Sequence, residues 1–294
     1  MKSFFPASLL LAVCLMVETT AAGQTPQPTS TPTATPSSVP ATQGTRTIRT
    51  VPNVPDDAFN QWAFGVNYWL TTGPSSLLPG LQSTDPMAQY LPLAGSDKRT
   101  YGITLVAPAG KYNRLEITAF QARGSGTSTT PIDVTFFGNA YPSGDALLAS
   151  YRVRDFKVSY NYLTYPAPPT SRFRFKTLYE IQYVSALVTV QAPLDLNSLP
   201  ASGTRNIILP TFGVGTDIVA SSNFHLEVKG SGFALPGRSL ILDGQADAVV
   251  RVGKVEVVGG MKYFRYRTSP KKDEFVQGRY FGPQLGIRYI FGGK

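Results

Sequence analysis

The sequence predicts an all-β fold, a closed antiparallel β-barrel of about ten strands. Three observations lead to this prediction. Apolar and polar residues alternate with a period of two along most segments after residue 60, as in strands with one apolar and one polar face. Long and short connections alternate between these segments. No stretch after residue 46 keeps the spacing of an amphipathic helix.

The chain begins with a segment typical of a secretory signal peptide, residues 1–22. Lys2 gives the positive start, residues 9–17 form an apolar run, and residues 20–22 form a small-residue cleavage site. The run is shorter than the roughly 20 apolar residues of a membrane-spanning helix. The single cysteine, Cys14, lies in this run, so the mature chain is expected to contain none. A lipid anchor at Cys14 is disfavoured because the preceding Val13 is bulky.

Residues 23–59 are expected to form a disordered linker rich in Pro, Thr and Ser. The part up to residue 45 contains no charged and no aromatic residue. Such a segment cannot bury enough apolar area to offset the entropy lost on ordering, and its prolines favour an extended chain. Residues 60–294 remain as the one domain with strand patterning.

The alternation places ten strands in this domain. They are expected near 60–71, 98–107, 111–122, 147–163, 171–188, 206–220, 222–234, 238–252, 254–266 and 275–291. In the fourth strand the apolar residues change parity near Arg154-Asp155, which predicts a β-bulge there. Residues 132–137 are a further candidate strand, so counts from eight to twelve stay open.

The connections separate into two groups. Long ones fall at 72–97, 123–146, 189–205 and 267–274, and short turns fall between the remaining strands. The tight turn at 235–237 is the exception on the long-loop side. This arrangement is typical of bacterial transmembrane barrels, and ten strands would leave both chain ends on the short-turn side.

The polar face distinguishes a membrane barrel from a soluble β-sandwich, the alternative that the alternation leaves open. Charges of both signs occupy it, and aromatic residues lie near strand ends on the apolar face. We therefore predict a closed antiparallel transmembrane β-barrel whose lumen charges are paired, because a lone buried charge is costly. The expected lumen network comprises Arg152, Arg172, Arg174, Glu180, His225, Glu227, Asp243, Asp247, Arg251, Glu256, Lys262 and Arg288.

Composition restricts the chemistry. The formal net charge is +9, yet charged residues make up only 15%, below the roughly 25% of an average soluble domain. One His and one Cys exclude the common zinc sites and an intramolecular disulfide. Nucleic acid is disfavoured as a partner because the cations fall on lumen parity or in loops. Anionic lipopolysaccharide is the better expectation, with Lys271-Lys272 as a candidate contact.

The last predicted strand carries a family resemblance. Leu285, Ile287, Tyr289 and Phe291 alternate with polar or small residues and end in an aromatic residue. Over residues 60–294 the sequence resembles small outer-membrane β-barrel proteins of diderm, Gram-negative-type bacteria. The resemblance implies an outer-membrane location, an N-terminal linker in the periplasm, and a terminal strand read by the barrel-insertion machinery. Here three residues, Gly292-Gly293-Lys294, follow Phe291 and depart from that pattern.

Catalysis is disfavoured because His225 has no recognisable partner. Asn223-Phe224-His225 lacks the Asp of the Asp-x-His element of ten-stranded outer-membrane proteases, and His225-Leu226-Glu227 lacks the His-x-Ser of outer-membrane lipid hydrolases. Ser231, on the same parity, lies about 20 Å from His225 along a strand. No catalytic, cofactor-binding or metal-binding residue is assigned.

Three functions remain in order of preference. The first is a structural or surface-interaction barrel with a lumen filled by paired charges and an unspecified surface ligand. The second is a narrow channel for small solutes or ions, opened by glycines on the polar face. The third, disfavoured, is a lipid hydrolase or protease. The glycines considered for the channel are Gly65, Gly213, Gly215, Gly260 and Gly286.

Overall fold

A computed structural model describes residues 61–79, 91–93, 99–110, 113–130, 132–163, 172–195, 199–271 and 274–291. The predicted signal peptide and linker lie outside these residues. The strands are β1 (Trp62–Leu70), β2 (Ser75–Pro79), β3 (Leu91–Pro92), β4 (Arg99–Pro108), β5 (Arg114–Thr129), β6 (Val134–Phe136), β7 (Asn139–Tyr141), β8 (Ala146–Leu163), β9 (Phe173–Gln191), β10 (Ala201–Ser221), β11 (Phe224–Ala234), β12 (Leu240–Val252), β13 (Val255–Arg267) and β14 (Glu274–Phe291).

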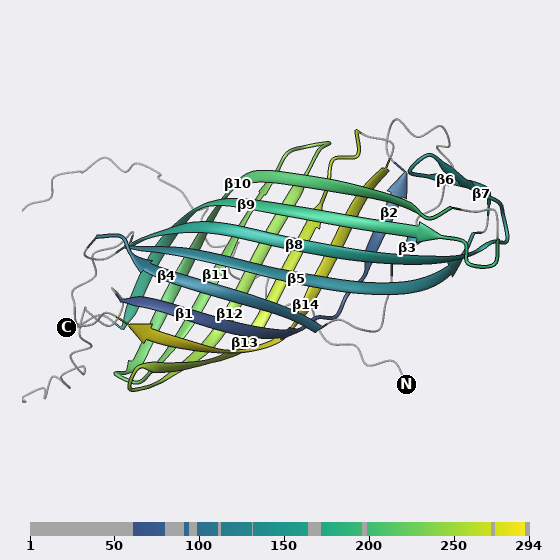
Figure 1. Cartoon of the computed structure of the whole chain (residues 1–294). Helices are drawn as coiled ribbons and strands as arrows, with labels where there is room; N and C mark the ends of the chain where they lie inside the picture. Colours follow the sequence, from purple (N-terminus) through teal and green to yellow (C-terminus); the bar gives the residue numbers. More distant parts are fainter. Residues whose placement is uncertain are drawn as a thin grey trace, which may run out of the picture. The chain divides into compact units, whose positions relative to one another are not determined.

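Ten of these strands form a closed antiparallel barrel (Figure 1). Their order is β1-β4-β5-β8-β9-β10-β11-β12-β13-β14, and β14 pairs back onto β1 from Trp62↔Phe291 to Trp69↔Gln284. The predicted fold class and strand number are therefore confirmed. Closure pairs the first strand with the last. No sheet edge with unpaired backbone N–H and C=O groups is then exposed to lipid, where such groups are costly. In the described part of the chain, no helix is long and apolar enough to cross a membrane.

The barrel has two different ends. The turn end carries the short connections and both ends of the barrel chain, and the loop end carries the long connections and the 235–239 turn. β5, β8, β9 and β10 have 16, 18, 19 and 21 residues, against 11 in β11, and they extend furthest at the loop end (Figure 1).

Four short strands lie at the loop end and leave the barrel count at ten. β2 pairs with the first residues of β14, and β3 pairs with β2. β6 and β7 form a hairpin inside the connection between β5 and β8. The candidate strand at 132–137 thus belongs to this hairpin and not to the barrel wall.

The outer wall is apolar. Ile208 is 68% exposed, Ile181 63%, Leu285 59% and Ile103 51%, values unsuited to water but suited to lipid. Aromatic side chains gather near the turn end, where the rings of Trp62 and Phe291 stack with centroids 6.5 Å apart. Such rings prefer the boundary between headgroups and acyl chains.

The predicted bulge at Arg154-Asp155 is wrong. β8 pairs with both β5 and β9 in unbroken register through this point. The character of the interior changes along β8 instead. In the half near the turn end, Asp155 and Ser159 point into the interior, and in the half near the loop end, Tyr151 and Val153 do so. All four residues are buried. The apolar residues change parity because the interior passes from a polar layer to an apolar one.

Candidate functional site in the barrel interior

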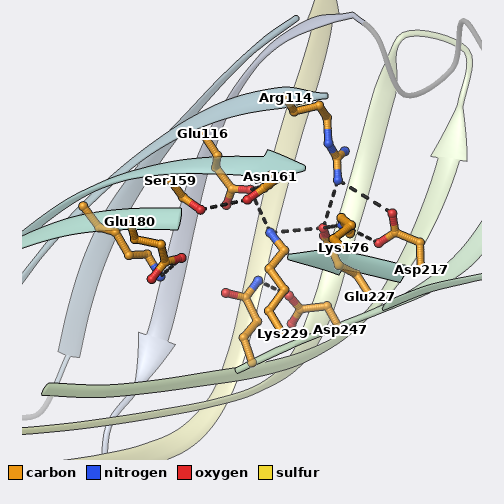
Figure 2. A network of polar contacts seen from close by, with 12 residues as sticks. Arg114, Glu116, Ser159, Asn161, Lys176, Glu180, Asp217, Glu227, Lys229 and Asp247 are labelled. Carbon is orange, nitrogen blue, oxygen red and sulfur yellow. Dashed lines mark hydrogen bonds and ion pairs between the residues drawn. The ribbon is translucent and has the colours of Figure 1, made fainter. Parts of the chain in front are cut away.

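The polar layer is centred on Glu227 of β11 (Figure 2). Its Oε1 accepts hydrogen bonds from Lys176 Nζ at 3.1 Å and Arg114 Nη2 at 3.3 Å, and Lys229 Nζ lies 3.1 Å away. Arg288 Nη2 lies 3.8 Å from Oε2. One buried carboxylate therefore faces four cations, contributed by β5, β9, β11 and β14.

Two further carboxylates share these cations. Asp217 Oδ1 lies 2.7 Å from Lys176 Nζ, and Glu116 Oε2 accepts from Lys229 Nζ at 2.8 Å. Glu116 also accepts from Asn161 Nδ2 at 3.1 Å. Because each cation serves more than one carboxylate, the group acts as one network rather than as separate pairs.

A second group lies beside the first. Lys157 Nζ donates to Asp243 Oδ2 at 2.8 Å and lies 3.8 Å from Glu180 Oε1. Thr211 Oγ1 donates to Glu180 at 2.9 Å. Asp247 is held differently, by the neutral amides of Gln284, at 2.6 Å, and Gln245. Pairing of this kind offsets the desolvation cost of burying charge.

The apolar layer fills the loop half of the interior. The ring of Phe120 packs edge-on against Trp69 at 5.6 Å and Phe264 at 5.1 Å, and Tyr280 stacks on Phe264 at 6.4 Å. Trp69 Nε1 donates to the Gly282 carbonyl at 3.1 Å, which satisfies its buried donor. These aromatic residues form one cluster with buried Leu, Val, Ala and Ile from most of the wall strands.

Lys262 joins the two layers. Its Nζ lies 4.8 Å from the centre of the Phe120 ring and 5.5 Å from that of Trp69. A cation over an aromatic face is stabilised by the ring quadrupole. The polar layer and the apolar layer are thus in direct contact through Lys262.

The β6–β7 hairpin closes the loop end over this layer. Phe136 and Tyr141 are buried in the apolar cluster, and Tyr141 Oη donates to the Val190 carbonyl at 3.2 Å. Glu274 accepts from the Phe137 backbone N–H at 2.8 Å and pairs with Arg205 at 2.6 Å. The hairpin is therefore fixed to β9, β10 and β14.

The glycines considered for a water path are crowded instead. A Cβ on Gly213 would lie 2.5 Å from Ser231 Cβ, on Gly260 2.2 Å from Asp247 Oδ1, and on Gly286 3.2 Å from Asn67 Cβ. Three interior cavities measure only about 30, 40 and 20 Å³. Cavities of that size hold isolated waters.

The structure places ten of the twelve predicted lumen residues on inward-facing positions: Arg174, Glu180, His225, Glu227, Asp243, Asp247, Arg251, Glu256, Lys262 and Arg288. Arg288 Nη1 donates to Glu256 at 3.1 Å, and Arg251 Nη2 donates to Gln61 at 2.8 Å. His225 lines the cavity of about 30 Å³ together with Arg251 and Glu256.

Two predicted lumen residues are not in the lumen. Arg152 faces outward, because the lumen parity of β8 at the loop end belongs to Tyr151 and Val153. Arg172 is exposed just before β9 begins. Arg152 was misassigned because the apolar residues Tyr151 and Val153 were taken to face outward, and Arg172 because it lies outside the strand that begins at Phe173.

Some cations and carboxylates at the centre of the network were not predicted. Arg114, Glu116, Lys157 and Asp217 were not among the predicted residues. The signal was present for the first two, because Arg114 and Glu116 share the polar parity of β5. Lys157 was obscured by the expected bulge.

The insertion-strand residues face the lipid side. Leu285 is 59% exposed, Ile287 55%, Tyr289 49% and Phe291 39%. Their recognition by insertion machinery stays a prediction. Among the described residues, no three His, Cys, Asp or Glu side chains are grouped so as to hold a metal ion.

No protein-family model matches the sequence, and no curated protein is similar to it. The chain is similar in structure to several solved proteins. The outer membrane protease OmpT from Escherichia coli has a TM-score of 0.55 at 8% identity, covering 79% of this chain and 97% of that chain. The transport unit of the autotransporter AIDA-I from Escherichia coli has a TM-score of 0.41 at 10% identity, covering 79% and 90%. Ail of Yersinia pestis has a TM-score of 0.33 at 9% identity, covering 79% and 99%. The OmpT match, together with the closed ten-stranded wall, shows that the chain has the fold of a small bacterial outer-membrane β-barrel, and at 8% identity the likeness extends to fold alone.

Proposed function

We propose that the chain is an outer-membrane β-barrel with a closed lumen and a structural or surface-interaction role. The closed wall, its apolar outer face and the shared fold support the location. The loop end faces outward in this proposal, and the short turns face the periplasm, as in barrels with short periplasmic turns and longer outer loops.

One observation carries the closed lumen: two different layers fill it in series. The ionic network of Glu227 and Asp217 occupies the turn half, and the aromatic cluster around Phe264 occupies the loop half. A channel needs a continuous water path, whereas the three interior cavities found among the described residues, of about 20 to 40 Å³, hold isolated waters. A closed interior supports a role at the outer surface rather than in transport.

Planar-bilayer recording tests the closed lumen. The protein is refolded in detergent, and folding is verified by a mobility difference between heated and unheated samples in SDS gels. We expect no steady conductance from the folded protein, while a porin in the same bilayer conducts. Stable unitary conductance from the folded fraction would replace this proposal with the narrow channel.

A further inference from the structure

The charges on the outer wall are all of one sign. Every carboxylate in the ten barrel strands faces inward. The strand cations that face outward are Arg99, Arg123, Arg152, Arg154, Arg265, Arg267 and Arg279, all near the loop end. Neutralising anions for this set must therefore come from the loops or from the surroundings.

Three of these arginines form a row across adjacent strands. Arg123 of β5 pairs directly with Arg152 of β8. The register that pairs Tyr101 with Gln121, continued by two residues, brings Arg99 of β4 opposite Arg123. Neighbouring strands are about 4.8 Å apart, and like charges directly opposite one another are destabilising. A second outward pair, Arg265↔Arg279, repeats this on β13 and β14.

A hollow of about 750 Å³ lies over the row. Besides the three arginines, its lining includes the hydroxyl-bearing Ser125, Ser150 and Thr189. Among the described residues, Arg152 Nε is buried without a hydrogen-bond partner. Buried donors without a partner are uncommon in native proteins, and this one belongs to the arginine row. The hollow exceeds a single phosphate and offers hydroxyls as well as cations.

The row lies at the edge of the apolar wall. Next to it toward the turn end are Tyr101, 64% exposed, Ile103 and Phe156, 45% exposed. A lipid whose acyl chains cover these side chains places its headgroup at the arginines. The absence of outward strand cations near the turn end matches a membrane whose outer leaflet alone carries such headgroups.

We propose that this hollow binds the phosphorylated sugar headgroup of an outer-leaflet glycolipid of the lipopolysaccharide class. Guanidinium groups bind phosphate through paired hydrogen bonds. Three arginines on adjacent strands offer such donors along a row roughly 10 Å long. The hydroxyls of Ser125, Ser150 and Thr189 meet the sugar. This site, rather than Lys271, is the main lipid contact.

The test compares two double variants of the full mature chain in phosphatidylcholine nanodiscs. The probe is bisphosphorylated lipid A, and the readout is its Kd by native mass spectrometry. We expect R123Q/R152Q to raise Kd at least about tenfold, the equivalent of one charged hydrogen bond. R238Q/K271Q removes the same charge from loop-end turns and should change Kd less than about twofold.

Further arms identify the ligand chemistry. R123K/R152K keeps the charge but loses paired hydrogen bonding, so its Kd should fall between the wild type and R123Q/R152Q. Phosphate-free lipid A should bind the wild type and R123Q/R152Q equally weakly. Equal effects of the two Gln double variants would overturn the site. Full competition by inorganic phosphate, or equal binding of phosphatidylglycerol, would overturn the glycolipid assignment. Heat-dependent gel mobility verifies that each variant is folded. If a double variant does not fold, the single variant R152K replaces it in the comparison.

Discussion

At the scale of single residues, Glu227 concentrates the electrostatic stability of the barrel. Its carboxylate faces Arg114, Lys176, Lys229 and Arg288, and its side chain is only 2% exposed. We predict that Glu227→Gln destabilises the barrel by about 3–5 kcal/mol, because it leaves buried cations uncompensated. Urea unfolding in lipid vesicles measures this change.

Asp247→Asn provides the matched control for Glu227→Gln. Asp247 is held by the neutral amides of Gln245 and Gln284. Replacing its carboxylate with an amide therefore leaves no buried cation without a partner. We expect a loss of about 1–2 kcal/mol. Equal destabilisation by the two substitutions would contradict the network centred on Glu227.

At the scale of elements, the β6–β7 hairpin depends on a glycine in the neighbouring wall. A Cβ on Gly203 of β10 would lie 2.2 Å from the Phe137 ring, which also stacks near Arg205. We predict that Gly203→Ala displaces the hairpin and leaves the barrel closed. Limited proteolysis of refolded protein should then cut the 130–145 connection faster, with the gel shift unchanged.

Gly230→Ala is the control for the hairpin experiment. It is the same substitution in a barrel strand, but nothing lies within 4 Å of the added Cβ. Its proteolysis rate should equal that of the wild type. Similar acceleration in both variants would mean that the hairpin is not fixed by the fit of Phe137 against Gly203.

The elements also show where sequence reasoning stops. Ten strands could be predicted because each keeps an apolar parity facing lipid. The loop-end extensions of β5 and β10 could not, because residues 123–129 and 201–205 are mostly Gly, Ser and Thr and carry no apolar alternation. The two-layered interior was missed for a related reason: Tyr151 and Val153 face inward, and an apolar residue does not reveal which side it faces.

At the scale of the whole molecule, the orientation of the barrel makes a prediction that labelling can check. Leu199, in the long connection before β10, is 75% exposed, and Lys254 is exposed in a short turn. We predict that Leu199→Cys reacts with a membrane-impermeant thiol reagent on intact cells and that Lys254→Cys does not. The only native cysteine, Cys14, lies in the predicted signal peptide, so the unsubstituted chain gives the background.

Permeabilising the outer membrane controls this labelling experiment. Both cysteines should then react, which shows that Lys254→Cys is accessible from the periplasmic side. Labelling of Lys254→Cys alone on intact cells would reverse the orientation. The glycolipid site at the loop end would then face the periplasm and would fail with it.

The lumen network has a consequence for how the barrel assembles. Arg114 and Glu227 are 113 residues apart in the chain, on β5 and β11. Neither strand pairs with the other, so their contact forms across the interior only when the sheet curls round. An open sheet in the bilayer would separate Arg114 from Glu227, and a buried charge that loses a partner is costly. Partly assembled intermediates are thereby disfavoured, and closing the cylinder becomes a cooperative last step.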